Sequence, residues 1–536
     1  MNLRTLKAPA VAAAVLLLAV AAAGCTDTTV YPTSTISSST LFSDPRSYQE
    51  FLGKIYASLA LTGQQAGAGN ADITCNDEGA CNYIRLWWEF QELPTDEAII
   101  AWNDGSLSQL NTQLLTSDNG FLYGMYYRIY FLVGMANEFL RQTTDGAVAS
   151  RGASAALKAQ VQQYRAEARF LRALAYWHAL DIFGGWVPLV TENDPLGSTP
   201  PKQSDPVTVY NYIVSELTAI QGQLPAPSAA TYGRATTMAA NMLLAHVYMN
   251  DSVYTSGTNW TGALNAAQAV ISSGVYSLDP SYRHLFQADN NTSPEMIFAI
   301  PQDGLKTQEY GGTDFLICAS SGGSFSGTSG LGCSWWGIRL KPQADSFYIT
   351  TADHPAGDTR NSYFVTEAGG QSLGITDWTA FTQGYGVPKY VNITSTGANG
   401  SSTQFADTDF PMFRLGDAFL IYAEACVRSG ASGCAANALT YVDSLRVRAY
   451  GNATGNITAP QLTLPFLLTE RGRELLWEGH RRTDLLRYNL FTGSTRLWSY
   501  KNNVPAGAAT ASTYNIFPLP RTELQVNPNL KQHGYN

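Results

Sequence analysis

Apolar residues recur every three or four positions in one long stretch of the N-terminal half, which predicts a helix over Gln162–Phe183. A second apolar stripe, formed by Phe170, Leu174 and Trp177, lies on another side of the same helix. A helix that is apolar on two sides lies between neighbouring helices. His178 falls on the apolar face, so we interpret it as a packed core residue rather than a ligand.

Shorter helical patterns accompany this one, separated by brief Gly or Pro breaks. They are expected over Asn119–Arg141, Asp205–Leu224, Thr237–Asn250 and Thr261–Ser273. After Asp409 the apolar periodicity returns over Leu415–Cys426 and Ala438–Ala449. Gly430 and Gly433 mark the turn between these two helices. Repeated arms of this length predict a tetratricopeptide-like stack, and the fold class is therefore mostly α.

The stretch between these two helical parts has a different character. Gly, Ser, Thr, Asn and Asp dominate it, its periodicity is lost, and its aromatic residues stand singly or in pairs. We predict a large irregular region that carries the binding function. The expected boundaries are a helical scaffold at about 47–275 and 410–490, the loop-rich region at about 276–409, and an irregular C-terminal segment at 491–536.

The N-terminus follows the plan of a secretory signal. Arg4 and Lys7 give it a positive start, and Val11–Ala23 is an apolar run too short to span a membrane. Small residues directly precede Cys25 and polar residues follow it. We predict a signal peptide at 1–24, a lipid on Cys25, a flexible tether at 25–45, and one globular unit at 46–536. The alternative is an ordinary secretory signal that ends near a cysteine.

Charge and composition narrow the class of ligand. Charged residues make up 14% of the chain, aromatic residues 12%, and the formal charge is −9, or −11 once Arg4 and Lys7 leave with the signal peptide. The sequence has no basic stripe, so we expect no nucleic-acid partner. A surface rich in hydroxyl, amide and flat aromatic groups favours neutral polar ligands.

Seven cysteines are present, and six remain if Cys25 carries lipid. They fall into close sequence neighbours, and an exported protein permits disulfides, so we predict the pairs Cys75–Cys81, Cys318–Cys333 and Cys426–Cys434. No CxxC pair occurs and the six histidines are scattered, so no zinc site is expected. Asp289, Asn290 and Asn291 offer oxygen ligands for calcium, but we favour a solvated turn there and predict no metal or cofactor.

Four stretches together carry a resemblance that covers the mature chain. They are AEARFLRALAYWHALDIFGGWVPLVT at Ala166–Thr191, FRLGDAFLIYAEACVRSG at Phe413–Gly430, ERGRELLWEGHRRTDLLRY at Glu470–Tyr488, and FPLPRTELQVNPNL at Phe517–Leu530. SPEMIFAI at Ser293–Ile300 and VDSLRVRA at Val442–Ala449 also fit. In this order and spacing the chain resembles the SusD/RagB family of outer-membrane nutrient-uptake lipoproteins.

The resemblance implies a scaffold of four tetratricopeptide-like helix pairs with an irregular half built on it. It also implies a non-catalytic lipoprotein, exposed on the cell surface at the outer membrane, that captures oligosaccharides or peptides for a TonB-dependent transporter resembling SusC. Two departures concern the anchor, because Ala22 replaces a frequent leucine and only Asp27 follows Cys25 as an acid. These departures leave open which face of the outer membrane carries the protein.

Paired carboxylates in the third stretch invite an enzymatic interpretation, since Glu470 and Glu474 lie one helical turn apart and glycoside hydrolysis uses two carboxylates. An ion-pair interpretation is stronger. On a continuous helix Glu478 reaches Arg481 and Arg482. Asp484 likewise reaches Arg487, and Glu470 reaches Arg473. No GxSxG, P-loop or HExxH motif is present, so we predict no enzyme.

Aromatic residues in loops are the candidates for sugar capture, because a flat apolar ring stacks on the CH-rich face of a pyranose. The candidate ligand-binding residues are Trp102 with its neighbours Asn103 and Asp104, Tyr310, Trp335, Trp336, Trp378 and Tyr385. Neighbours on an extended backbone face opposite ways, so one member of the pair Trp335 and Trp336 is expected to be buried. Each of the others has the alternative role of a packed loop anchor.

Three functions remain in competition. The first is a substrate-binding lipoprotein without catalysis, whose ligand contacts lie within 95–110 and 270–410. The second is a tetratricopeptide-type scaffold that binds only other proteins and has no affinity for a small ligand. An enzyme is the third. The aromatic loops discriminate between the first two, because only a capture protein needs exposed stacking faces there.

Overall fold

The computed structural model describes residues 41–64, 71–73, 79–197 and 199–535. The predicted signal peptide, Cys25, most of the predicted tether and Cys75 therefore lie outside the described residues. The chain divides into two units, 1–47 and 48–536. In the described part of the first unit, Arg46 pairs with Asp44 at 2.7 Å. Within the described ranges, no helix has the length and apolarity needed to cross a membrane.

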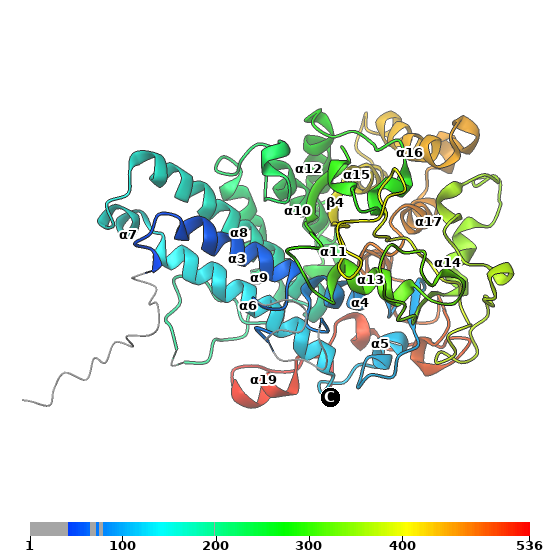
Figure 1. Cartoon of the computed structure of the whole chain (residues 1–536), viewed down its shortest axis with the longest axis horizontal. Helices are drawn as coiled ribbons and strands as arrows, with labels where there is room; N and C mark the ends of the chain where they lie inside the picture. The colour runs from blue at the N-terminus through cyan, green and yellow to red at the C-terminus, as the bar shows by residue number, and fades with distance from the viewer. Residues whose placement is uncertain (1–40, 65–70, 74–78, 198, 536) are drawn as a thin grey trace, which may run out of the picture. The chain divides into compact units, whose positions relative to one another are not determined.

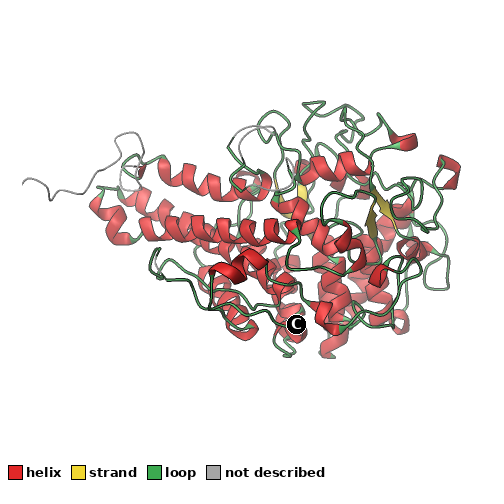
Figure 2. Cartoon of the chain, turned by 90° about the horizontal axis from the view of Figure 1, so that it is seen from below, coloured by secondary structure: helices red, strands yellow, loops and turns green. Residues whose placement is uncertain are grey.

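Helices dominate the second unit, as the sequence pattern predicts (Figure 1, Figure 2). In the N-terminal half they are α3 Ser47–Ala60, α4 Tyr83–Glu92, α5 Ser108–Thr112, α6 Gly120–Gln142, α7 Asp145–Ser150, α8 Ala155–Phe183, α9 Pro206–Ile220, α10 Thr237–Met249, α11 Asp251–Tyr254 and α12 Trp260–Ser272. The others are α13 Gly312–Ser320, α14 Pro342–Asp345, α15 Leu415–Ser429, α16 Ala435–Tyr450, α17 Leu464–Glu474, α18 Arg481–Arg487 and α19 Arg521–Val526.

Consecutive long helices pack against one another in the scaffold. The helix α6 packs on α8, α8 on α9, α10 on α12, and α15 on both α12 and α16. In Figure 1 the labelled α6, α8 and α9 run side by side. This pairing is consistent with the predicted tetratricopeptide-like stack and confirms the mostly helical fold class.

The central helix α8 shows how local chemistry sets its ends. It begins at Ala155, seven residues earlier than predicted, because the Ser154 side chain accepts a hydrogen bond from the backbone N–H of Leu157 and caps the first turn. It ends where Gly184 takes a left-handed backbone, with φ of 65°. His178 is fully buried and its ring stacks on Trp87 with centroids 3.8 Å apart, as expected for a core residue.

Two short antiparallel ribbons attach the loop-rich region to the scaffold. Strand β1, Ala98–Ile100, pairs with β3, Ile338–Leu340, so that Ile100 lies opposite Ile338. Strand β2, Met296–Ile300, pairs with β4, Phe410–Arg414. Each ribbon joins segments that are far apart in the sequence. The predicted loop region is therefore held at two places by backbone hydrogen bonds.

The loop-rich region also contains a helix that the sequence pattern does not reveal. All nine residues of α13, Gly312–Ser320, are buried. A short helix that is buried on every side has no polar stripe, so it shows no apolar periodicity. This helix positions two residues of the candidate site described below.

A buried ion network joins the loop-rich region to the C-terminal helices. The Arg414 guanidinium contacts Glu295 at 2.8 Å, Glu474 at 2.7 Å and Glu478 at 2.6 Å. Lys389 reaches the same Glu478 at 2.7 Å. All five groups are buried, so removal of one partner leaves an uncompensated charge, which typically costs about 3–5 kcal/mol.

The predicted ion pairs within the stretch Glu470–Tyr488 are partly correct. Glu470 pairs with Arg473 at 2.9 Å and Asp484 with Arg487 at 2.7 Å. The expectation that Glu478 reaches Arg481 or Arg482 is wrong, because α17 ends at Glu474 and α18 starts at Arg481. Between the two helices the chain turns through left-handed residues, and Glu478 points to Arg414 and Lys389 instead.

Acid should destabilise the folded chain through these carboxylates. Burial alone would raise the pKa of Glu470, but Arg360 and Arg473 outweigh it and lower the pKa from 4.5 to about 2. The pKa of Glu474 falls to about 2 in the same way, despite its burial. A depressed folded-state pKa stabilises above the unfolded value and is lost as the pH falls. We expect the melting temperature to drop steeply between about pH 4.5 and pH 2.

A series of melts by circular dichroism measures this drop. The Glu470→Gln variant should melt lower at pH 7, because Arg360 loses a charged partner, and should lose less on further acidification. A melting temperature that is constant from pH 5 to pH 2 in the native chain would contradict the network's role.

Candidate functional site

The β1–β3 ribbon brings two predicted site residues together. Because the strands are antiparallel, the end of β1 lies beside the start of β3. The ladder continues past the strands, where the Ala101 backbone N–H donates to the Gly337 carbonyl at 2.9 Å. The indole N–H of Trp102 then donates to the Trp336 carbonyl at 2.6 Å. Trp102 and Trp335 thereby become neighbours despite more than two hundred intervening residues.

Gly337 is required for this close approach. Its φ of 154° lies at the edge of the region that favours glycine, and an added Cβ would stand 2.4 Å from Nε1 of Trp102. Any larger residue would push the indole away from the ribbon. The glycine therefore fixes the position of the Trp102 ring.

A disulfide positions Trp335 on the other side. Cys318, near the end of α13, is bonded to Cys333, which confirms that predicted pair. The Trp335 backbone N–H donates to the Cys318 carbonyl at 3.0 Å. Tyr310 directly precedes Gly311, the N-cap of the same helix. The helix α13 therefore holds the segments that carry Tyr310 and Trp335.

Three half-buried rings form a continuous line, which we call the aromatic row: Trp102, Trp335 and Tyr310. The centroids of Trp102 and Trp335 are 6.4 Å apart with planes tilted by 57°. Those of Trp335 and Tyr310 are 6.2 Å apart with a tilt of 55°. Because each plane is tilted relative to the one before it, the three rings do not form one flat surface. It presents aromatic faces without any charged group among its three members.

Buried aromatic residues support the row from behind. Phe315 of α13 meets Trp102 edge-on, with centroids 5.9 Å apart, and Phe405 packs on Tyr310 at 5.3 Å. Gln404 donates its amide to the Tyr310 hydroxyl at 2.7 Å. The Arg85 guanidinium lies 4.4 Å from the Phe315 ring centroid. Sequence reasoning missed all four residues, because nothing in their local pattern distinguishes them from other loop or core positions.

The remaining predicted site residues lie at different places. Asn103 and Asp104 are exposed in the turn that follows Trp102. Trp336 is only 9% exposed, so the stacking face of that pair belongs to Trp335, and one member is buried as predicted. Trp378 packs instead against Ile99, Ile375 and Tyr500. Tyr385 is half-buried and its carbonyl accepts from the Leu340 N–H at 2.7 Å. Neither of these two has a ring contact with the row among the described residues.

The Cys426–Cys434 disulfide is present as predicted, whereas the Cys75–Cys81 pair involves a residue outside the described ranges.

The prediction of a solvated turn at Asp289–Asn291 is wrong for Asn290. Asn290 is buried, and its side-chain amide donates to the carbonyls of Leu285 and Asp409, both at 2.9 Å. The Asp289 carboxylate accepts a hydrogen bond from the Ser395 hydroxyl at 2.6 Å.

One buried group of potential metal ligands occurs among the described residues: His246, Asp417 and His480. The fold brings these together although the histidines are scattered in the sequence. Asp417 lies 2.7 Å from His246 and 3.0 Å from Arg471. Its charge is therefore balanced within the protein. We interpret the group as part of the buried ionic core.

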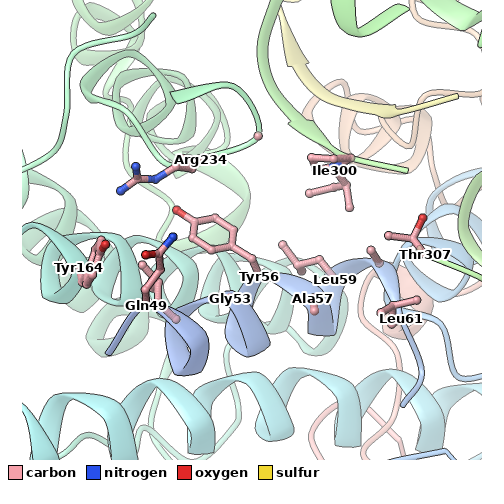
Figure 3. A pocket seen from close by; sticks show the side chains of 14 residues that line it. Gln49, Gly53, Tyr56, Ala57, Leu59, Leu61, Tyr164, Arg234, Ile300 and Thr307 are labelled. Carbon is pink, nitrogen blue, oxygen red and sulfur yellow. The ribbon is translucent and has the colours of Figure 1, made fainter. Parts of the chain in front are cut away.

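An apolar hollow of about 340 Å³ lies along α3 (Figure 3). Figure 3 shows Tyr56 rising from α3 toward Arg234, with Ile300 and Thr307 on the opposite side. The polar groups at one end are hydrogen-bonded to a common acceptor, the Glu167 carboxylate. The Tyr56 hydroxyl donates to it at 2.7 Å, and Nε of Arg234 donates to it at 3.0 Å. The hollow therefore offers a ligand few hydrogen-bonding groups that lack a partner among the described residues. The sequence did not predict this hollow.

Comparison with known proteins gives consistent matches over the described chain. The sequence profile of the SusD family matches residues 248–535, which include Tyr310 and Trp335. A second profile, described as starch-binding associating with outer membrane, matches residues 86–249, which include Trp102. The starch-binding protein SusD of Bacteroides thetaiotaomicron is 33% identical over 90% of this chain and 91% of its own length. A SusD-like protein of Bacteroides ovatus is 26% identical over 80% of this chain and 77% of its own length.

Solved structures share the fold at lower sequence identity. Surface glycan-binding protein A from Bacteroides thetaiotaomicron, in complex with laminarihexaose, superposes with a TM-score of 0.68 at 20% identity, over 91% of this chain and 99% of the other. A SusD superfamily protein from Parabacteroides distasonis gives a TM-score of 0.69 at 21% identity, with the same coverage. These structures extend the comparison to the arrangement of helices and loops.

Proposed function

This chain belongs to the SusD family, and from that premise we propose that it is a non-catalytic, substrate-binding lipoprotein that captures oligosaccharides at the outer membrane. The aromatic row is the observation that carries the proposal. Its three rings come from segments matched by the family profiles, and they offer adjoining apolar faces for successive sugar rings. A relative that is 33% identical is named for binding starch.

The tilts between neighbouring rings of the row favour a glucan that is not flat. A flat ribbon-like chain such as a β-1,4-glucan cannot lie on rings whose planes turn by 57° and then by 55°. An α-1,4-glucan bends continuously and can present successive apolar faces to successive rings. A β-1,3-glucan also bends and is the second choice. An extended peptide has no comparable series of flat apolar faces, so we place the peptide alternative behind both glucans.

Hydrogen-bonding groups lie next to the row and suit sugar hydroxyls. Asn103 and Asp104 are exposed in the turn after Trp102. Gln404 is exposed beside the Tyr310 hydroxyl, to which it is hydrogen-bonded. Stacking with a few such contacts gives moderate affinity, which suits a protein that passes its ligand on. Trp336, Trp378 and Tyr385 then act mainly in packing, since their rings lie outside the row.

The paired carboxylates support a binding role over a hydrolytic one. Glu470 and Glu474 are fully buried and each contacts Arg360, at 2.9 and 3.0 Å. The guanidinium groups around them hold the pKa of each carboxyl at about 2 despite burial, so neither is a proton donor at neutral pH. A retaining or inverting glycosidase needs one carboxylic acid that stays protonated. This pair therefore serves the ion network.

Replacing Trp335 by Ala should weaken glucan binding while the fold survives. A stacked aromatic ring contributes roughly 0.5 to 1.5 kcal/mol beyond the area it buries, so affinity should fall by about 2- to 13-fold. Trp335 is the middle ring, and its loss also separates the other two. Calorimetry with maltoheptaose, laminarihexaose and cellohexaose measures the change, and thermal melting checks folding. Trp378→Ala is the matched control and should bind like the native chain.

Two results would overturn this proposal. One is unchanged affinity for every glucan in folded Trp335→Ala and Trp102→Ala variants. The other is absence of glucan binding by the native chain together with capture of a protein partner, which would favour the tetratricopeptide-type scaffold function.

The anchor and the partner complete the proposal. We place a lipid on Cys25 after removal of residues 1–24, and a SusC-like TonB-dependent transporter as the acceptor of the ligand. The small residues before Cys25 support the first, and family membership supports the second. The protein then works at the cell surface, held by its lipid. The helical scaffold at about 47–275 and 410–490 carries the loop-rich binding region at about 276–409.

The anchor predicts a change of location in a single variant. Cys25→Ala should move protein that is not bound to the transporter from the membrane fraction to the soluble fraction, because the diacyl group is its only expected attachment to lipid. Immunoblotting of the separated fractions measures this, with Cys333→Ala as a control that keeps the anchor. Mass spectrometry of the native protein should find an acylated Cys25 as the first residue, and an unmodified N-terminus elsewhere would refute the anchor.

A further inference from the structure

Two adjoining hollows lie outside the aromatic row and its supports. One of about 510 Å³ lies among α8, α11 and α18 and is lined in part by Trp186, Tyr254 and Asn489. The other, of about 370 Å³, lies beside α9 and α11. Neighbouring residues line both, because Pro206 and Ser252 face the first while Val207 and Asp251 face the second. We call the two hollows together the trough.

The charged groups in the first hollow are already satisfied. Asp181 accepts hydrogen bonds from Arg482 at 2.7 Å and from the Tyr254 hydroxyl at 2.8 Å. Arg487 is held by Glu424 at 2.7 Å and by Asp484 at 2.7 Å. This hollow therefore presents no unbalanced charge to a ligand. A neutral ligand fits it better than an anion or a cation.

The second hollow repels anions. Asp251, which carries the carboxylate of this hollow, is 7% exposed. It accepts a hydrogen bond from the Thr255 hydroxyl. No cation pairs with Asp251 among the residues that the structure describes. The carboxylate can still accept a hydrogen bond from a hydroxyl of a neutral molecule. An anionic ligand is therefore disfavoured in this half of the trough, and a hydroxyl-bearing one is favoured.

Neutral polar groups without a hydrogen-bond partner among the described residues line both hollows of the trough. The side chains of Ser252 and Asn489 in the first hollow, and of Asn211 and Thr258 in the second, make no hydrogen bond within the described ranges. Each is a hydroxyl or an amide, which can both donate and accept. Sugar hydroxyls have the same dual character. Four such groups in the two hollows match a chain of hydroxyl-bearing units.

Apolar surface lies between these polar groups. His533 covers one face of the Trp186 indole, with centroids 3.7 Å apart and planes within 7°, and holds the ring in place at the edge of the first hollow. Val253 is 38% exposed and Val207 is 47% exposed. An apolar wall with a fixed indole suits the CH-rich face of a pyranose.

We propose that the trough binds a neutral oligosaccharide, as a second carbohydrate site separate from the aromatic row. The ligand class rests on the proposed function, whereas the position rests on the trough alone. Two adjoining hollows accommodate more than one sugar unit. Occupation of both sites would allow the protein to hold two parts of one long glycan or two chains at once.

The test starts from a variant without the aromatic row, Trp102→Ala with Trp335→Ala, verified as folded by thermal melting. Saturation-transfer NMR and calorimetry with maltoheptaose, laminarihexaose and cellohexaose then report residual binding. We expect residual binding of at least one glucan, weakened about 2- to 13-fold by Trp186→Ala, the range for loss of one stacked ring. Val253→Glu should weaken it by at least 10-fold, because a charged side chain then occupies the first hollow.

Val447→Glu is the matched control, since Val447 of α16 is 39% exposed and lies outside the trough. It should leave residual binding unchanged.

If the row variant binds no glucan while the native chain does, the trough proposal is overturned and the proposed function stands. If the row variant binds like the native chain and Val253→Glu abolishes binding, the trough is the main site and the row proposal fails. Equal binding by Val253→Glu and Val447→Glu also overturns the trough.

Discussion

The buried contacts of Arg414 hold the two halves of the molecule together. One guanidinium contacts Glu295 next to β2, Glu474 at the end of α17, and Glu478 in the turn beyond it. Arg360 from the loop-rich region contacts Glu470 and Glu474. Lys389 from the same region contacts Glu478. The loop-rich region has only short helices and strands, and these buried charges fix it to the scaffold at defined points. Their desolvation is repaid only because each buried charge has a partner.

The aromatic row depends on that attachment. Its three rings come from segments around residues 102, 310 and 335, and no single element contains two of them. The β1–β3 ribbon aligns Trp102 with Trp335, the Cys318–Cys333 disulfide limits the loop before Trp335, and α13 holds Tyr310. Each constraint acts on the backbone, which leaves the faces of the rings available. This arrangement suits a protein that binds a flexible chain and then releases it.

Prediction from the sequence succeeded where the signal is local and failed where it depends on distant contacts. The two apolar stripes of α8 were sufficient to place that helix and to identify His178 as core, and only its start was misjudged because the Ser154 cap lies before the stripes. Glu478 was misassigned because a continuous helix was assumed through a turn that includes left-handed Trp477 and Gly479. Trp102 and Trp335 were both candidates for the binding surface, but their direct contact could not be derived from the sequence, since it requires pairing of two very short strands. The burial of one member of the pair Trp335 and Trp336 was predicted, but the choice of Trp336 over the half-buried Trp335 needed the glycines that enclose Trp336.

A crystal structure of the protein grown with maltoheptaose tests the central claim most directly. We expect electron density for consecutive glucose rings against Trp102, Trp335 and Tyr310, with the chain curving along the row and hydroxyls near Asn103 or Gln404. An ordered glucan bound elsewhere, with the three rings free of ligand and of crystal contacts, would contradict the assignment of the aromatic row as the capture site.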